Sequence, residues 1–306
     1  MSNQHRYLTL DNYLKEKYGQ KVCKIALNGD FTCPNRDGTI STKGCLFCSA
    51  EGSGEFAGQR GEALEKQFAS IRSMMHQKWP DALYIVYFQA NTNTYGPLEK
   101  LKNLFEKAIN LDEKIIGLSI ATRCDCLDEE VLAYLEELNQ RIPVWVELGL
   151  QTIHHQTMEF LNLGYDLKTF TKAVSKLRSR GITTIVHIIN GLPGEDKNMM
   201  LETASFLNNI DIQGVKLHSL FILKNTILGK MYQENPFPLL SMAEYVDIVC
   251  EQIAILKENI VIHRISGDAP LKELLTPLWS IKKLVVMNEI DKLMKAKNYY
   301  QGCKRI

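Results

Sequence analysis

Six short apolar runs alternate along the chain with stretches that carry apolar residues at helical spacing, and this alternation limits the fold more than any other feature. The runs predict strands at Val22–Leu27, Leu83–Phe88, Ile115–Ala121, Val144–Leu148, Thr183–Ile189 and Val215–Leu220. The stretches between them predict helices at Glu62–Gln77, Leu98–Asn110, Asp128–Gln140, His154–Leu161, Leu167–Arg180 and Lys197–Asn208. Repeated strand–helix units build parallel sheets, so we expect an α/β fold with a partial (βα)6 TIM-type barrel.

The pattern changes after Leu220. We expect residues 1–220 to form the barrel core with an N-terminal segment, and residues 221–306 to form a C-terminal extension packed on that core. Within the extension the spacing predicts helices at Met242–Asn259 and Leu284–Lys297, with a strand at Ile260–Ile265.

The last part of the extension is basic. Residues 281–306 have a local charge of +5, because seven basic side chains stand against Glu289 and Asp291. The seven are Lys282, Lys283, Lys292, Lys295, Lys297, Lys304 and Arg305. A solvated helix face and a phosphate-binding patch both explain this composition.

The overall composition predicts a compact cytoplasmic protein that does not enter a membrane. Lys plus Arg is 36 and Asp plus Glu is 35, so the chain lacks the strong positive field of a nonspecific nucleic-acid binder. The polar N-terminal sequence has no apolar segment of a signal peptide, and no apolar run is long enough to span a bilayer. In a reducing compartment the 8 cysteines are not expected to form disulfides, which favours metal binding or redox chemistry where they cluster.

Cys33, Cys45 and Cys48 lie within sixteen residues, in the sequence CPNRDGTISTKGCLFC that follows the first predicted strand. Three thiolates can ligate three irons of a [4Fe–4S] cluster and leave the fourth iron open to another ligand. A structural zinc site is the alternative, but zinc prefers four protein ligands. The fourth ligand would have to come from Cys23, His5 or the CDC sequence at 124–126.

Polar residues follow the other predicted strands. Because the carboxyl ends of parallel strands meet at one face, these residues could together hold a polar cofactor. They are Gln89, Asn91, Thr92, Asn93, Ser119, Thr122, Arg123, Asp125, Glu147, Gln151, His187, Asn190, Lys216 and His218. Any one of them can instead be a turn former or a helix cap. Glu147 and His187 are the more informative members, since each interrupts an apolar strand where an unpaired polar group is costly to bury.

The remaining features support several interpretations. Cys124 and Cys126 are metal-ligand candidates or incidental thiols, and Cys303 is a candidate auxiliary ligand or an accessible thiol. Cys23 and Cys250 lie in apolar runs and are expected in the core. The sequence GLPGE at 191–195 predicts a tight loop whose amides could contact an anion or a ribose.

These motifs together resemble radical S-adenosylmethionine (SAM) enzymes, in particular the YhcC/YtqA-like (MnmL-type) branch, which is related to the Elongator catalytic subunit and to oxygen-independent coproporphyrinogen oxidase. The cysteine spacing is eleven residues and then two, wider at its start than the common CxxxCxxC. The further matches are YFQANTNTY (87–95), IATRCDCL (120–127), VELGLQT (146–152) and HIINGLPGED (187–196). The resemblance covers most of the chain.

The resemblance implies a [4Fe–4S] cluster ligated by Cys33, Cys45 and Cys48, with Phe47 packed over it. The open iron would bind SAM, whose reductive cleavage gives a 5′-deoxyadenosyl radical. The implied SAM contacts come from the motifs and are Gln89, Asn91, Ser119, Thr122, Glu147, Gln151 and His187. Two departures stand out: Asn162–Tyr165 lacks an arginine that relatives carry, and Cys124 replaces an expected proline.

The resemblance also implies a substrate. It points to the wobble uridine of tRNA, with conversion of 5-carboxymethylaminomethyl-uridine to 5-aminomethyl-uridine, and to an electron donor such as flavodoxin or ferredoxin. Hydrogen abstraction next to nitrogen could begin this removal of a carboxymethyl group. A radical enzyme for a small molecule and a zinc-containing RNA-binding protein without catalysis are the alternatives.

Overall fold

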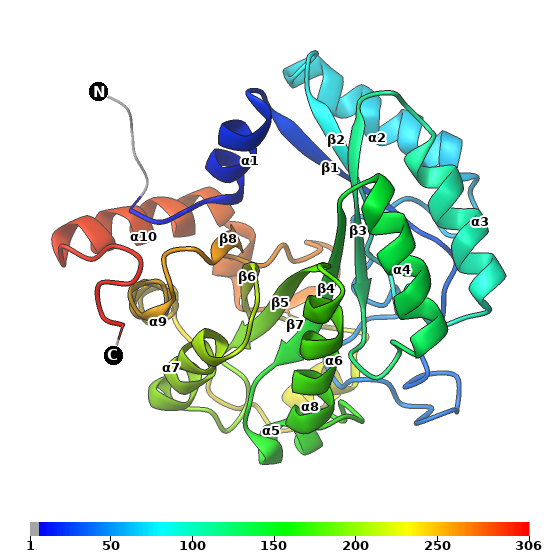
Figure 1. The fold of residues 1–306 in the computed structure, drawn as a ribbon. Coiled ribbons are helices and arrows are strands. Elements are labelled where there is room, and N and C mark those ends of the chain that lie inside the picture. Colours follow the sequence, from blue (N-terminus) through cyan, green and yellow to red (C-terminus); the bar gives the residue numbers. More distant parts are fainter. Residues whose placement is uncertain (1–5, 306) are drawn as a thin grey trace.

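The computed structural model describes residues 6–305 and contains one seven-stranded sheet in which all neighbouring strands are parallel. The strand order is β1-β2-β3-β4-β5-β6-β8. Figure 1 shows that the sheet is strongly curved, with helices around its outer face. The strands are β1 (Val22–Leu27), β2 (Leu83–Phe88), β3 (Ile115–Thr122), β4 (Val144–Gln151), β5 (Thr183–Asn190), β6 (Gly214–Ser219) and β8 (Val261–Arg264). The predicted partial barrel is confirmed, with a seventh strand from the C-terminal extension.

Helices connect consecutive strands as the sequence predicts, and capping residues define where several of these helices start. The connecting helices are α2 (Leu64–Lys78), α3 (Leu98–Ile109), α4 (Glu129–Arg141), α5 (His155–Phe160), α6 (Leu167–Ser179) and α7 (Lys197–Phe206), which a short 3₁₀ helix, η1 (Leu207–Asn209), follows. Asp128, Asp166 and Asp196 each accept a backbone hydrogen bond at the start of α4, α6 and α7. A side-chain acceptor at this position satisfies an amide that the helix leaves unpaired.

The sheet separates an apolar outer face from a polar inner one. Alternate residues of β1 and β2, such as Ile25 and Val86, are buried in the main hydrophobic core beneath the helices. Their neighbours on the strands point to the concave side, because side chains alternate along a strand. On that side Lys24, Glu147 and Lys216 lie at mid-strand. The sequence therefore places charged side chains inside the barrel.

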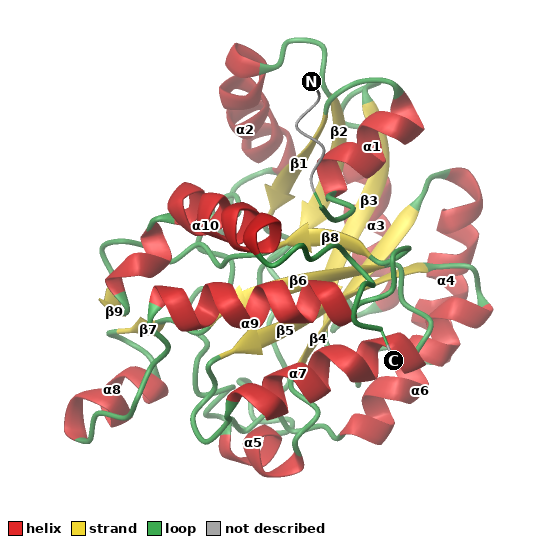
Figure 2. Cartoon of the chain, turned by 90° about the vertical axis from the view of Figure 1, so that its left-hand side faces the viewer, coloured by secondary structure: helices red, strands yellow, loops and turns green. Residues whose placement is uncertain are grey.

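The extension contributes a strand of the main sheet, four helices and a separate two-stranded antiparallel sheet. Its helices are α8 (Ile227–Glu234), α9 (Met242–Ile255), α10 (Lys283–Ala296) and the 3₁₀ helix η2 (Leu278–Ile281), and β7 (Ile222–Leu223) pairs with β9 (Leu274–Thr276). Figure 2 shows α9 and α10 side by side next to β6 and β8. Because β8 joins the main sheet, the extension adds one strand to the partial barrel. A domain boundary at residue 220 stays a prediction.

The first described residues cover the outer edge of β8. Ile262 N donates to Leu8 O at 2.8 Å, and Leu8 N donates to Gln301 Oε1 at 2.9 Å. The helix α1 (Leu10–Tyr18) follows and was not predicted, because its sequence is short and mostly polar. Both chain ends thus contribute to one edge of the sheet.

Most of the basic side chains near the C-terminus are ion-paired. Lys297 and Lys304 contact Glu251, and Lys297 also contacts Asp247 at 2.5 Å. Lys283 and Lys292 pair with Asp268 and Glu289. Four of the seven basic side chains in this segment therefore have acidic partners, which favours the solvated-face interpretation over a free phosphate-binding patch.

Candidate functional site

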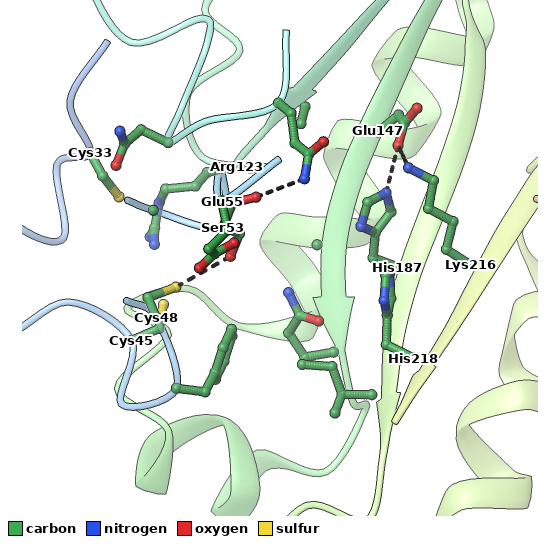
Figure 3. Close-up of a pocket in the computed structure, with 18 of the residues that line it drawn as sticks. Cys33, Cys45, Cys48, Ser53, Glu55, Arg123, Glu147, His187, Lys216 and His218 are labelled. Carbon is green, nitrogen blue, oxygen red and sulfur yellow. Dashed lines mark hydrogen bonds and ion pairs between the residues drawn. The ribbon is translucent and has the colours of Figure 1, made fainter. Parts of the chain in front are cut away.

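A cavity opens at the carboxyl ends of the strands, where the cysteine loop meets the concave face of the sheet. Among the residues proposed from the sequence, Ser119 does not line it; it is fully buried beneath. Figure 3 shows the three cysteines on one side of the cavity and Lys216 on the other. Of the eleven residues that the resemblance implied for the cluster and SAM, the ten other than Ser119 line the cavity: Cys33, Cys45, Phe47, Cys48, Gln89, Asn91, Thr122, Glu147, Gln151 and His187.

The cysteines belong to the long loop between β1 and α2. A turn brings Cys45 and Cys48 together, since Cys48 N donates to Cys45 O at 3.0 Å. Asn35 Nδ2 donates to Cys45 Sγ at 3.5 Å and to Asn162 O at 2.6 Å, which holds the loop against the segment after α5. The hydrogen bond from Cys48 lowers the pKa of Cys45 to about 7 and raises that of Cys48. One thiolate of the pair is therefore favoured near neutral pH.

The described side chains that were considered as a fourth zinc ligand have different surroundings. Burial, and then the nearby Asp125 and Cys33 charges, raise the pKa of Cys126, so this thiol lies near the cysteine loop. Cys23 is buried in the main core, Cys124 is 4% exposed, and His5 lies outside the described residues. Within residues 6–305 no group of three His, Cys, Asp or Glu side chains could hold a single metal ion. A [4Fe–4S] cluster binds each thiolate at a different iron, so its ligands stand further apart than those of one ion.

The predicted residues after β2 support the cysteine loop. Gln89 Nε2 donates to Ser53 O at 2.8 Å, and Asn91 N donates to Gly52 O at 2.9 Å. Arg36 Nη2 donates to the carbonyl of Ser49 at 2.6 Å. Gln89 and Asn91 thus line the cavity, and their hydrogen bonds fix the segment that follows Cys48.

Arg123 adds a guanidinium beside the cysteines. It makes a two-point pair with Asp125 at 2.9 and 2.7 Å and lies over the Tyr165 ring at 4.9 Å. Its Nη2 lies 3.5 Å from the position that a Cβ on Gly164 would occupy. The positive charge therefore sits beside the segment 162–165, where the sequence lacks the arginine expected from relatives. The sequence suggested Arg123 only as one polar residue among many.

Glu147 is the centre of the polar layer inside the barrel. Its side chain has no exposed surface, and its oxygens accept from Ser119 Oγ at 2.6 Å and from His187 Nε2 at 2.7 Å. The ammonium groups of Lys24 and Lys216 also contact this carboxylate. Each strand from β3 to β6 supplies one of these groups, and β1 supplies Lys24.

These contacts shift the charges of the layer. Burial alone would raise the pKa of Glu147, but Lys216 and Lys24 hold it well below its usual range. Burial lowers the pKa of Lys216 to about 7 despite Glu147, and burial with the Lys216 charge lowers that of His187 to about 4. Glu147 is therefore ionised and His187 neutral at pH 7, with the His187 proton on Nε2.

The other predicted polar residues have structural partners. Thr122 Oγ1 is 2.5 Å from Thr94 Oγ1, and Asn190 Nδ2 donates to Gln252 Oε1 at 2.8 Å. Gln151 adopts a positive φ of 67° at the end of β4 and faces the cavity. The GLPGE loop does not line the described cavity, so its predicted contact with a ligand stays a prediction.

Comparison with known proteins decides the family. The model of the radical SAM superfamily matches residues 37–207, and that of the radical SAM C-terminal domain matches residues 212–296. The Bacillus subtilis protein YtqA is 47% identical over 98% of this chain and 93% of its own length. This chain belongs to the radical SAM superfamily. Cys45 and Cys48 lie inside the match, and Cys33 lies just before it.

Other relatives of this radical SAM protein are more distant. Escherichia coli YhcC is 34% identical over 92% of this chain and 90% of its own length. A Methanocaldococcus jannaschii tRNA uridine(34) acetyltransferase is 26% identical over 56% of this chain and 31% of its own length. The solved structure of Elp3 from Methanocaldococcus infernus shares the fold, with a TM-score of 0.68 at 17% identity over 92% of this chain and 64% of that one.

Membership of the superfamily gives the cofactors. Radical SAM enzymes use a [4Fe–4S] cluster and SAM, as the resemblance implied. The cavity suits such a pair, because cysteine side chains and a polar strand face line one space. No helix in the described part of the chain has both the length and the apolar character needed to cross a bilayer.

Proposed function

We propose that this radical SAM enzyme modifies the wobble uridine of tRNA, converting 5-carboxymethylaminomethyl-uridine to 5-aminomethyl-uridine. One observation carries the proposal: the three cysteines line the same cavity as the polar layer around Glu147, so a cluster and a polar substrate group can be held in one space. The tRNA uridine(34) acetyltransferase relative and the Elp3-like fold support a uridine of tRNA as the substrate.

Cys33, Cys45 and Cys48 are the proposed cluster ligands, with Phe47 beside them. When bound, the cluster and SAM supply the radical that starts the reaction. The protein orients these groups and excludes water: Gln89 and Asn91 fix the loop, and Thr122, Gln151 and His187 border the cavity. Ser119 and Glu147 hold Lys24, Lys216 and His187 in place from below, so we assign them positioning roles rather than contacts with SAM.

The tRNA assignment is tested by mass spectrometry of tRNA nucleosides from cells with and without the gene. We expect 5-carboxymethylaminomethyl-uridine to accumulate when the gene is deleted. Unchanged wobble uridines would refute the assignment. A cytoplasmic location and an electron donor such as flavodoxin or ferredoxin accompany this proposal.

A small-molecule substrate is the second candidate, because most of the basic tail is ion-paired and leaves little free charge for RNA. One assay distinguishes a tRNA substrate from a small-molecule substrate. Purified tRNA that lacks the modification product is added to the enzyme with reductant and SAM. Stimulated formation of 5′-deoxyadenosine supports tRNA, and its absence supports a small molecule.

A further inference from the structure

The end of the cavity opposite the cysteines contains two cationic side chains from neighbouring strands. Lys216 is 8% exposed, and its ammonium lies 3.4 Å from the Tyr87 hydroxyl in addition to its contact with Glu147. Arg264 lines the same cavity from the end of β8 and pairs with Asp268 at 3.2 Å. Figure 3 shows Lys216 well separated from the cysteines.

Positive charge exceeds negative charge at this end. Lys216 and Arg264 line the cavity, and Lys24 contacts Glu147 without lining it. With Glu147 and Asp268 as the acidic groups, 3 − 2 gives +1 when Lys216 is protonated. Lys283 also contacts the Asp268 carboxylate, at 3.2 Å, so Asp268 neutralises Arg264 only in part. This increases the excess of positive charge. Buried charge without a counter-ion is costly, so an anion that enters here is stabilised.

Two polar atoms at the same end have no protein partner. Ser219 is 3% exposed, and neither its hydroxyl nor His218 Nε2 forms a hydrogen bond within the described residues. Both residues line the cavity, and the His218 ring lies 5.2 Å from that of His187. Buried polar groups are normally satisfied, so these two indicate a ligand that completes the site.

We propose that the Lys216–Arg264 end of the cavity binds a carboxylate of the substrate, with Ser219 and His218 as additional hydrogen-bond partners. A carboxylate carries a single negative charge, which this small excess can balance, whereas a phosphate monoester carries more. A carboxylate held here leaves the carbon next to it on the side of the cavity that faces the cysteines. This inference rests on the proposed function for the identity of its substrate: the carboxymethylaminomethyl group ends in such a carboxylate.

The first experiment needs no RNA. N-methylglycine has the same ammonium, methylene and carboxylate as the proposed substrate group, and saturation-transfer NMR detects its binding to the reconstituted protein with SAM. We expect a signal in the wild type. The affinity for N-methylglycine should fall about tenfold in Lys216→Met and in Arg264→Gln, because each variant loses a charged hydrogen bond. Lys295→Met removes an exposed lysine that does not line the cavity and should have no effect. Arg264→Gln keeps the test valid if Lys216→Met does not fold, because Arg264 pairs with the partly exposed Asp268 and not with the buried Glu147.

A second experiment connects the site to RNA. Fluorescence anisotropy compares anticodon stem-loops that carry 5-carboxymethylaminomethyl-uridine or 5-methylaminomethyl-uridine, which lacks the carboxylate. The wild type should prefer the first about tenfold, and Arg264→Gln should remove the preference. N-methylglycine binding without RNA preference would support the carboxylate site and refute the tRNA substrate. Three results would overturn the site. The wild type could give no N-methylglycine signal, the signal could be unchanged in both variants, or inorganic phosphate could displace N-methylglycine equally well.

Discussion

His187 Nε2 donates a 2.7 Å hydrogen bond to Glu147 Oε2 across neighbouring strands β5 and β4. The same carboxylate contacts Lys24 and Lys216. With the hydrogen bond from Ser119, Glu147 therefore connects five strands of the barrel through one fully buried group, and the inner surface of the barrel depends on its charge.

Replacing Glu147 by glutamine should destabilise the protein by about 3 kcal/mol, because it leaves two ammonium groups in the barrel without their counter-charge. Urea unfolding at pH 7 measures the free energy of unfolding. The double variant Glu147→Gln with Lys216→Met removes one charge of each sign and should lose less than the sum of the two single variants. A single variant as stable as the wild type would contradict the role of this pair.

Carboxylate binding should weaken as pH rises through about 7. Burial lowers the pKa of Lys216 to about 7, so the ammonium is charged below this pH and neutral above it. The charged and titratable groups around it are Glu147, Lys24, Arg264, Tyr87, His187 and His218.

NMR titration of N-methylglycine from about pH 6 to about pH 9 gives the midpoint of this loss. Arg264→Gln should move the midpoint upward, since the Arg264 charge is one of the causes that lower the pKa of Lys216. A midpoint that does not move, or affinity that increases with pH, would exclude Lys216 as the titrating group.

Substitution of Cys33, Cys45 or Cys48 by alanine should abolish the cluster. The loss is measured by iron and sulfide analysis and by the absorption band of the cluster, after anaerobic reconstitution. We expect each variant to retain less than about a tenth of the wild-type iron. Cys303→Ala is the matched control, because Cys303 is a partly exposed thiol outside the cavity. Full iron content in any of the three variants would remove that cysteine from the ligand set.

Gly52→Ala should reduce cluster assembly by displacing the loop after Cys48. A Cβ on Gly52 would lie 2.1 Å from Asn91 Oδ1, and its φ of +58° adds about 1–2 kcal/mol of strain for a residue with a side chain.

Gly61→Ala separates the two effects. Gly61 also has a positive φ, +77°, but a Cβ there meets no atom within 4 Å. It carries similar strain without the contact, so we expect normal iron content in Gly61→Ala and reduced content in Gly52→Ala. Equal iron content in both would show that the fit between Gly52 and Asn91 does not matter for assembly.

The strands were predictable because each is an apolar run of typical length between turn residues. β1 and β2 have the predicted bounds, Val22–Leu27 and Leu83–Phe88. The seventh strand was also present in the sequence as Ile260–Ile265, but nothing in the sequence indicated that it would join the barrel. Sheet order depends on packing between distant segments, which local patterns do not encode.

The charged interior was only partly predictable. Glu147 and His187 were recognised as unusual because each interrupts an apolar strand. Lys24 interrupts β1 in the same way and was overlooked, and Arg264 ends a strand that had not been assigned to the barrel. These side chains surround one carboxylate only because the sheet is curved. The curvature brings β1 and β6 close, although β2, β3, β4 and β5 lie between them in the strand order.

The hydrogen bonds that Leu8 and Gln301 make beside β8 have a consequence for shortened versions of the protein. Strands with unpaired peptide groups readily pair with strands of other molecules. Removing the residues before α1 would uncover the Ile262 amide, and removing those after α10 would uncover the Ile260 carbonyl, to which Gln301 Nε2 donates at 2.7 Å. Either change would offer an unpaired strand edge to neighbouring copies. Truncated proteins should therefore precipitate even if every cavity residue is intact.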